Sequence, residues 1–339
     1  MPYRPSGMIP VRRRIELGEL LPREGPLALE ADIFLPAHRR TPPVALFCLS
    51  GGALTRAYYH LQAAAAGPQV ADGAPARAAD DFSFAASMSA NGFIVVTLDH
   101  LGTGGSSRPR DGFALTPDVL TTAQGLAVDS ICHDLRAGHI PGQSQPLAEL
   151  HTIGVGHSMG AMLTALQQAR DRRHAALILL GFSTYGLAPA LTAEEAAFAA
   201  DPQGARANVA RLARTRSRGD PYPEVVSSPQ SRDLFAGKNA DRRGVEALQK
   251  TRTPLLVTAG LFAMIPGSST PECAQIDTPV FLAAGDRDIV GPPHEIPASF
   301  PASPDVTLLV LPATGHCHFL FASRRLLFSR AQGWIEALL

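Results

Sequence analysis

The sequence predicts an α/β protein built on an eight-stranded, mostly parallel sheet with helices on both faces. Short apolar runs of strand length recur along the 339 residues, and stretches of helical periodicity separate them. This alternation is typical of parallel sheets, in which each crossover between strands carries a helix. The later runs are almost uninterrupted by polar residues, as expected for strands that are buried on both faces.

Each element can be assigned from its own pattern. Eight segments have the length and composition of strands, namely residues 12–17, 27–34, 44–49, 93–98, 150–155, 176–180, 279–284 and 306–311. The first two alternate loosely between apolar and polar side chains, which indicates an antiparallel start to the sheet. Helices are expected at residues 81–90, 117–136, 159–170 and 323–338.

Two segments interrupt the rhythm of strand and helix. Residues 62–79 are rich in Ala, Gly and Pro and predict a surface excursion after the third strand. Residues 183–276 form a long detour between two buried strands, with amphipathic and charged pieces of helical length. A connection of that length must itself be folded. We therefore predict an α/β core of residues 1–182 and 277–339 with a helical cap, residues 183–276, inserted into it.

Composition limits the partners. Thirty basic and thirty acidic residues give a net charge of zero, so nothing predicts a nucleic acid or an anionic membrane as a partner. The N-terminal arginines precede no apolar signal segment, and no run of eighteen apolar residues occurs, so a cytoplasmic protein is expected. The four cysteines form no C-x-x-C pair. The sequence gives no information on oligomeric state.

The central motif is the pentapeptide Gly156-His157-Ser158-Met159-Gly160. It lies between an apolar run of strand length and a helical stretch, so the expected context is strand, sharp turn, helix. Such a turn strains the backbone at the serine and requires small residues on both sides. It also exposes the serine Oγ at the carboxyl end of the strand, above a helix N-terminus. This context predicts that Ser158 is a nucleophile, whereas a helix-capping serine in a Gly-rich turn is the structural alternative.

A serine nucleophile needs a base, and the base needs an acid that fixes its tautomer. After the seventh predicted strand come Asp286 and Asp288, and after the eighth come His316 and His318. Both groups leave the carboxyl end of a strand, as Ser158 does, where open α/β sheets bind ligands. We favour Asp288 as the acid, with Asp286 as a turn-forming alternative. We favour His316 as the base, with His318 as the alternative.

Two backbone N–H groups should stabilise the oxyanion of an acyl-transfer reaction. One belongs to Met159, the residue after the nucleophile. The other is expected in the loop after the third strand, which begins Ser50-Gly51-Gly52-Ala53. Small residues there let the backbone approach a tetrahedral centre. Gly52 is the first choice for this donor, Ala53 is the second, and a plain Gly-Gly turn is the structural alternative.

Taken together, these residues resemble the α/β-hydrolase superfamily over nearly the whole chain. The segment from Asp99 to Ser106 is similar to the D-x-x-G-x-G-x-S loop that follows strand four in that family. The family often has His-Gly in the oxyanion loop, where this chain has Ser50-Gly51. The resemblance implies the α/β-hydrolase fold and a Ser–His–acid hydrolase with a cap over its pocket. The superfamily also contains transferases, lyases and non-catalytic members.

The expected activity is hydrolysis of a small-molecule ester, lactone or thioester through an acyl-enzyme. Ser158 attacks, His316 transfers the proton, Asp288 orients His316, and the main chain at Met159 and Gly52 holds the oxyanion. No cofactor is expected, and no metal, because His316, Cys317 and His318 lack accompanying ligand spacings. Acyl transfer and carbon–carbon bond hydrolysis use the same residues and remain alternatives. A non-catalytic ligand-binding protein on this fold is the rival outside enzymes.

Overall fold

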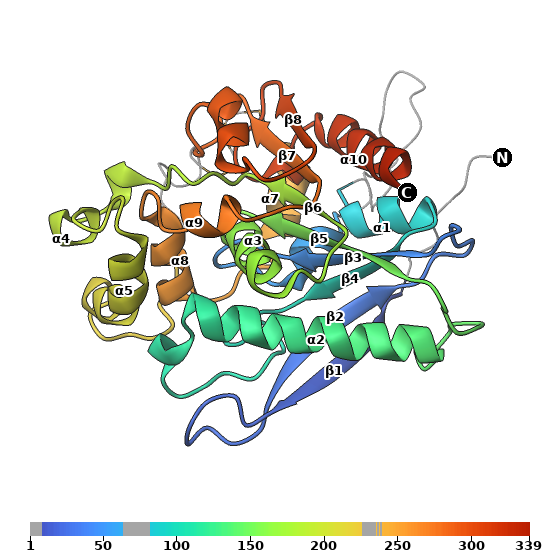
Figure 1. Cartoon of the computed structure of the whole chain (residues 1–339), viewed down its shortest axis with the longest axis horizontal. Coiled ribbons are helices and arrows are strands. Elements are labelled where there is room, and N and C mark those ends of the chain that lie inside the picture. The colour runs from blue at the N-terminus through green and yellow to red at the C-terminus, as the bar shows by residue number, and fades with distance from the viewer. Residues whose placement is uncertain (1–8, 64–81, 226–234, 236, 238) are drawn as a thin grey trace.

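A computed structural model describes residues 9–63, 82–225, 235, 237 and 239–339 (Figure 1). Its strands form one eight-stranded sheet in the order β1-β2-β4-β3-β5-β6-β7-β8. Strand β2 runs antiparallel to both of its neighbours, and the other pairs are parallel. The strands are β1 (Val11–Gly18), β2 (Leu27–Phe34), β3 (Val44–Leu49), β4 (Ile94–Leu98), β5 (His151–His157), β6 (Ala176–Leu180), β7 (Val280–Gly285) and β8 (Val306–Leu311). The predicted fold class is therefore confirmed.

Burial explains why these segments are strands. Every residue of β3, β4, β6 and β7 is buried, as both faces of a parallel sheet are covered. Strand β1 instead alternates between exposed and partly or fully buried residues, which suits an edge strand with charged residues that discourage further pairing. All eight strands predicted from the sequence are present, with ends shifted by no more than two residues.

Helices cover both faces of the sheet. The helices of the α/β core are α1 (Phe84–Ala90), α2 (Pro117–Ala137), α3 (Met159–Asp171) and α10 (Arg324–Leu338). One apolar cluster joins α2 and α3 to the sheet, and a second joins α1 and α10 to the opposite face (Figure 1). Local sequence sets the ends of α2. The Thr116 side chain caps its first turn, Pro117 occupies the first helical position, and Gly138 ends the helix with φ 75°.

The long segment 183–276 is folded and mostly helical where it is described. It contains α4 (Ala193–Ala196), α5 (Pro202–Arg216), α7 (Arg242–Gln249), α8 (Val257–Met264) and α9 (Thr270–Cys273). Figure 1 shows α4 and α5 projecting to one side of the sheet, with α8 and α9 between them and α3. Leu261, Phe262 and Ile265 are buried in the same apolar cluster as α2 and α3. The inner part of the segment is thus continuous with the core. Most of the predicted excursion at 62–79 lies outside the described residues.

The parallel strands bring four loops to one edge of the sheet. Leu49 at the end of β3 pairs with Gly156 in β5, and His157 pairs with Leu180 at the end of β6. Gly285 at the end of β7 pairs with Leu311 at the end of β8. The loops that follow β3, β5, β7 and β8 therefore start at the same edge of the sheet, which is what a site assembled from them requires. Among the described residues, no helix is both long and apolar enough to cross a membrane.

Candidate active site

Ser158 occupies a sharp turn between β5 and α3. Its backbone has φ 55° and ψ −123°, a conformation that residues other than glycine rarely adopt. The main-chain N–H of Ser158 donates to the carbonyl of Leu180 at 2.8 Å, which ties the turn to β6. A Cβ atom on Gly156 would lie 2.3 Å from the Cα of Ala161, and one on Gly160 would lie 2.2 Å from the carbonyl oxygen of Leu49. Both glycines of the pentapeptide are therefore required by space.

His316 lies between Ser158 and Asp288. Its Nε2 is 2.9 Å from the Oγ of Ser158, and its Nδ1 is 2.7 Å from Oδ1 of Asp288. A carboxylate only accepts, so Nδ1 carries the proton and Nε2 is free to accept the serine hydroxyl. The side chains of His316 and Asp288 are 4% and 0% exposed, so water competes little for these bonds. This arrangement, which we call the candidate triad, has the connectivity of a nucleophile, a general base and an orienting acid.

The two aspartates after β7 have different surroundings. Asp286 is exposed and accepts hydrogen bonds from the main-chain N–H groups of Ala313 at 2.8 Å and Thr314 at 3.0 Å. These bonds lower the pKa of Asp286. It therefore joins the loop after β7 to the loop after β8, while Asp288 is the aspartate that reaches His316.

The two histidines after β8 both contact Asp288. His316 bonds Oδ1, whereas His318 is fully buried and its Nε2 lies 2.7 Å from Oδ2. Burial alone would raise the pKa of Asp288, but the electrostatic interactions and hydrogen bonds with the imidazoles of His316 and His318 outweigh it and hold that pKa well below its usual range. His316 is the histidine that also reaches Ser158.

The loop after β3 lies against the nucleophile turn. A Cβ atom on Gly51 would be 3.2 Å from the Cβ of Ser158, and one on Gly52 would be 3.9 Å from the Sδ of Met159. Ala53 has φ 60°, and its carbonyl accepts from the N–H of Thr253. The main-chain N–H groups of Gly52 and Ala53 donate to no described residue, so both stay candidates for the second oxyanion donor.

A buried histidine braces this loop. Nε2 of His100 lies 2.9 Å from the carbonyl oxygen of Ser50, and the side-chain amide of Gln124 in α2 lies 2.8 Å from Nδ1 of His100. The amide N–H therefore donates to Nδ1, and Nε2–H donates to Ser50. Burial lowers the pKa of His100, which keeps the ring neutral and this pattern intact. The sequence places His100 in the loop after β4 but gives no sign of this contact.

Asp99 explains the loop that resembles D-x-x-G-x-G-x-S. Its carboxylate is fully buried and pairs with the guanidinium of Arg56, and it accepts hydrogen bonds from the N–H groups of Arg56 and Gly105. Gly104 has φ 53°, and a Cβ there would overlap the Asp99 carboxylate. Asp99, Gly104 and Gly105 of this loop thus shape the backbone beside the site.

Among the described residues of segment 183–276, the side chains of Phe235 and Leu255 lie close to the site. The ring of Phe235 lies 5.6 Å from the ring of His316, centroid to centroid, and its carbonyl accepts from the N–H of Cys317 at 3.0 Å. Leu255 lies over the oxyanion loop, with its Cδ1 3.1 Å from the position of a Cβ on Gly52. The aromatic side chains of Tyr58, Tyr59, Phe82 and Phe84 are fully buried in the core.

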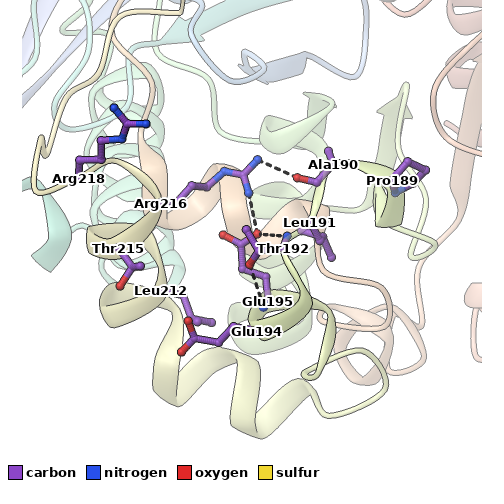
Figure 2. Close-up of a pocket in the computed structure, with 10 residues that line it drawn as sticks. All are labelled: Pro189, Ala190, Leu191, Thr192, Glu194, Glu195, Leu212, Thr215, Arg216 and Arg218. Carbon is purple, nitrogen blue, oxygen red and sulfur yellow. Dashed lines mark hydrogen bonds and ion pairs between the residues drawn. The ribbon is translucent and has the colours of Figure 1, made fainter.

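A cavity of about 520 Å³ lies elsewhere, between α4 and α5 (Figure 2). Its charge is largely neutralised internally, because Arg216 pairs with the buried Glu195 at 2.6 Å and donates to the carbonyl of Ala190 at 2.9 Å. Figure 2 shows these groups pointing at one another across the hollow. No residue of the candidate triad lines it. Across the described part of the chain, no group of three or more His, Cys, Asp or Glu side chains is placed to hold a metal.

Comparison with known proteins agrees with this architecture. A sequence model of the family described as "alpha/beta hydrolase fold" matches residues 72–323. Among solved structures, an esterase from Thermogutta terrifontis superposes with a TM-score of 0.60 at 16% identity, over 96% of this chain and 99% of that one. An E-2-(acetamidomethylene)succinate hydrolase gives 0.57 at 15% identity, over 96% and 99%. A bromoperoxidase from Bacillus anthracis gives 0.54 at 14% identity, over 95% and 98%. A search of curated proteins found no match.

The protein has a mostly parallel α/β fold. The carboxyl ends of its strands carry the turn that contains Ser158 and the loops that contain Asp288 and His316. The family match covers well over half of the chain, from residue 72 to residue 323. The chain belongs to the α/β-hydrolase fold family. This membership supports a hydrolase that acts on a small molecule, while the structural neighbours, at 14–16% identity, show the shared fold alone.

Proposed function

We propose that the protein is a serine hydrolase that cleaves a carboxylic ester or lactone through an acyl-enzyme. The observation that carries this proposal is the position of His316, with one ring nitrogen 2.9 Å from the Oγ of Ser158 and the other 2.7 Å from Asp288. A serine–imidazole–carboxylate chain is the arrangement that makes a hydroxyl nucleophilic. Its position at the carboxyl ends of the strands agrees with ligand binding in open α/β sheets.

In the first half of the reaction, the Oγ of Ser158 attacks the carbonyl carbon while His316 Nε2 takes the hydroxyl proton. Asp288 stabilises the resulting imidazolium through Nδ1–H. The main-chain N–H groups of Met159 and Gly52 hold the oxyanion, with Ala53 as the alternative to Gly52. Collapse breaks the bond to the leaving oxygen, which receives the proton from His316. Water then attacks the acyl-enzyme by the same steps and releases the acid.

A labelling experiment tests this assignment. The wild-type protein should react with a fluorophosphonate probe and hydrolyse p-nitrophenyl esters of some chain length. Ser158→Ala should abolish both, with a loss on the order of a millionfold in kcat. Ser183→Ala is the matched control, because Ser183 is a buried serine near the same rim whose Oγ donates to Val290. Unlabelled wild-type protein, or a folded Ser158→Ala protein with a tenth of wild-type activity, contradicts the proposal.

Acyl transfer, thioester cleavage and carbon–carbon bond hydrolysis use the same side chains. Two measurements separate hydrolysis from transfer. One is the free acid released when water is the sole acceptor, and the other is the acyl product formed when an alcohol, amine or thiol is added. Supplying lactones and thioesters in the same panel identifies the acyl class. Failure to label with fluorophosphonate combined with tight ligand binding would instead indicate a non-catalytic ligand-binding protein.

The segment 183–276 acts in this proposal as a cap that selects substrates, inserted into a core of residues 1–182 and 277–339. Support comes from Phe235 against His316 and from Leu255 over the oxyanion loop. Leu261 and Ile265 also belong to this segment, but substitutions there cannot test substrate selection. Both residues are buried in the core, and a polar side chain in their place would destabilise the fold. Leu255→Ala should therefore change the ranking of kcat/KM across an ester panel. Leu191→Ala, in the separate cavity, is the control and should leave the ranking unchanged.

A further inference from the structure

The carboxylate of Asp288 is held by a second imidazole. His318 Nε2 lies 2.7 Å from Oδ2, on the side of the carboxylate away from His316, and both side chains are 0% exposed. The main-chain N–H groups of Ile289 and Gly285 complete the set, at 2.7 Å from Oδ1 and 3.3 Å from Oδ2. Each oxygen therefore accepts one imidazole and one main-chain donor, which fixes the plane of the carboxylate as well as its position.

Three described side chains next to this cluster, those of His157, Tyr58 and Cys317, carry no charge that would compensate the carboxylate. His157 faces His318 from the end of β5, with ring centroids 5.9 Å apart, and burial with its histidine neighbours holds the pKa of His157 well below its usual range. Burial raises the pKa of Tyr58, whose ring lies 4.7 Å from that of His157, centroid to centroid, and raises the pKa of Cys317 to about 12. All three side chains are uncharged near neutral pH. The Asp288 carboxylate therefore depends on its hydrogen-bond donors, and among the described residues His318 is its only side-chain donor besides His316.

The tautomer of His318 follows from its partners. Nε2 must donate, because the carboxylate only accepts. Nδ1 is buried and has no hydrogen-bond partner among the described residues. A proton on Nδ1 would be a buried donor without an acceptor, which is unfavourable. The ring therefore acts as a neutral, one-donor clamp on Oδ2, and the carboxylate keeps its negative charge for His316.

We propose that His318 is a positioning residue that fixes the Asp288 carboxylate against His316 and draws part of its charge away from that hydrogen bond. The proposal rests on the function proposed above. The clamp makes two separable contributions. It holds Oδ1 in line with Nδ1–H, which sets the orientation of the base relative to Ser158. The hydrogen bond from His318 also makes Asp288 a weaker acceptor for His316. Protonation of His316 is then less favourable than it would be if His316 were the only imidazole bonded to Asp288.

Two substitutions separate a clamp from a space-filling residue. His318→Gln can place its amide nitrogen near the position of Nε2 and keep a donor to Oδ2. His318→Asn is one methylene shorter, so its amide reaches only the position of Nδ1 and Oδ2 loses the donor. Both variants remain polar and smaller than histidine, so neither overfills the core. His174→Gln is the control, because His174 is a buried histidine hydrogen-bonded near Thr152 and Gln167, on another part of the sheet.

Three measurements are made on each folded variant: kcat and KM for a p-nitrophenyl ester, the pH profile of kcat/KM, and the low-field proton resonance of His316 Nδ1–H. His318→Asn should lower kcat by about 10- to 100-fold with KM changed by less than about threefold. Its acid limb of kcat/KM should move about 0.5–1 pH unit upward, since one hydrogen bond to the carboxylate is lost. The resonance should shift in His318→Asn and return toward wild type in His318→Gln.

The proposal would be overturned if a folded His318→Asn protein kept the wild-type acid limb and the wild-type resonance. Equal decreases of kcat in His318→Asn and His318→Gln would also overturn it. The resonance does not depend on turnover. If the wild-type protein fails to react with fluorophosphonate, the proposed hydrolase function fails, while the comparison of resonances still decides whether His318 controls the Asp288–His316 bond.

Discussion

The side chain of His157 donates a hydrogen bond from Nε2 to the main-chain carbonyl of His316, at 2.9 Å. The residue before the candidate nucleophile thus holds the loop that carries the candidate base. The two loops start on β5 and β8, which are separated in the sheet by β6 and β7. Burial, together with His316 and His318, holds the pKa of His157 well below its usual range, so the ring stays neutral and keeps this donor in place.

The two aspartates after β7 should respond differently to the same change. Asp288→Asn should reduce kcat by on the order of ten-thousandfold, the size of effect seen when the acid of a serine triad becomes an amide and fixes the wrong histidine tautomer. Asp286→Asn should lose far less, because its remaining oxygen still accepts a main-chain hydrogen bond from the Ala313–Thr314 turn. Steady-state kinetics on both variants checks the prediction. A larger loss at Asp286 would move the acid to that position.

The hydrogen bonds that join Gln124 to His100 and His100 to the loop after β3 should affect kcat and not substrate binding. Gln124→Leu removes the donor to Nδ1 of His100, so the ring can change tautomer and release the carbonyl of Ser50. We expect kcat to fall by about 10- to 100-fold with little change in KM, because misplaced oxyanion donors act on the transition state. Gln143→Leu, beyond the end of α2, removes a glutamine that bonds only main-chain carbonyls and serves as control. Equal losses in both variants would contradict the prediction.

Glycine should be essential at position 160 and dispensable at position 333. A Cβ at Gly160 would lie 2.2 Å and 2.4 Å from the carbonyl oxygens of Leu49 and Ser50, so Gly160→Ala should destabilise the fold by at least about 3 kcal/mol. Gly333 is exposed within α10, and nothing lies within 4 Å of a Cβ there. Gly333→Ala should stabilise the protein by about 0.5–1 kcal/mol. Urea unfolding of both variants checks the pair, and a Gly160→Ala protein as stable as wild type would show that the two loops can separate.

A buried histidine outside the site should make stability depend on pH. Burial lowers the pKa of His174 to about 3, whereas an unfolded chain has a histidine pKa of about 6.5. Below pH 6.5 the unfolded state therefore binds a proton that the folded state does not, and stability falls with decreasing pH. Between pH 7.5 and pH 5.5, wild type should lose about 1.4 kcal/mol more than His174→Gln. His38→Gln, at an exposed position, should follow the wild-type curve.

The sequence predicted the sheet well because its strands are buried on both faces and read as unbroken apolar runs, as in Val44–Leu49 and Val280–Gly285. Order along the chain also predicted that Ser158, Asp288 and His316 follow strands whose carboxyl ends lie at one edge of the sheet. The roles of His100, Gln124, His157 and His318 were not predictable, because each acts on an atom of a different loop. The short helix α9 was missed, since four residues carry no periodicity.

The Ser158–His316 contact joins residues 158 positions apart, and Asp288 and His316 are 28 apart. No local segment of the chain can form these bonds alone, because β5, β7 and β8 must first be assembled with β6 between β5 and β7. Closing such distant contacts is slow, since the entropy of long loops is lost before the contacts are gained. Chemical reactivity of the serine should therefore arise late during refolding, after most secondary structure has formed. Refolding can be started by dilution from urea and a fluorophosphonate added at successive times. The time at which Ser158 becomes reactive would then report when the sheet is complete.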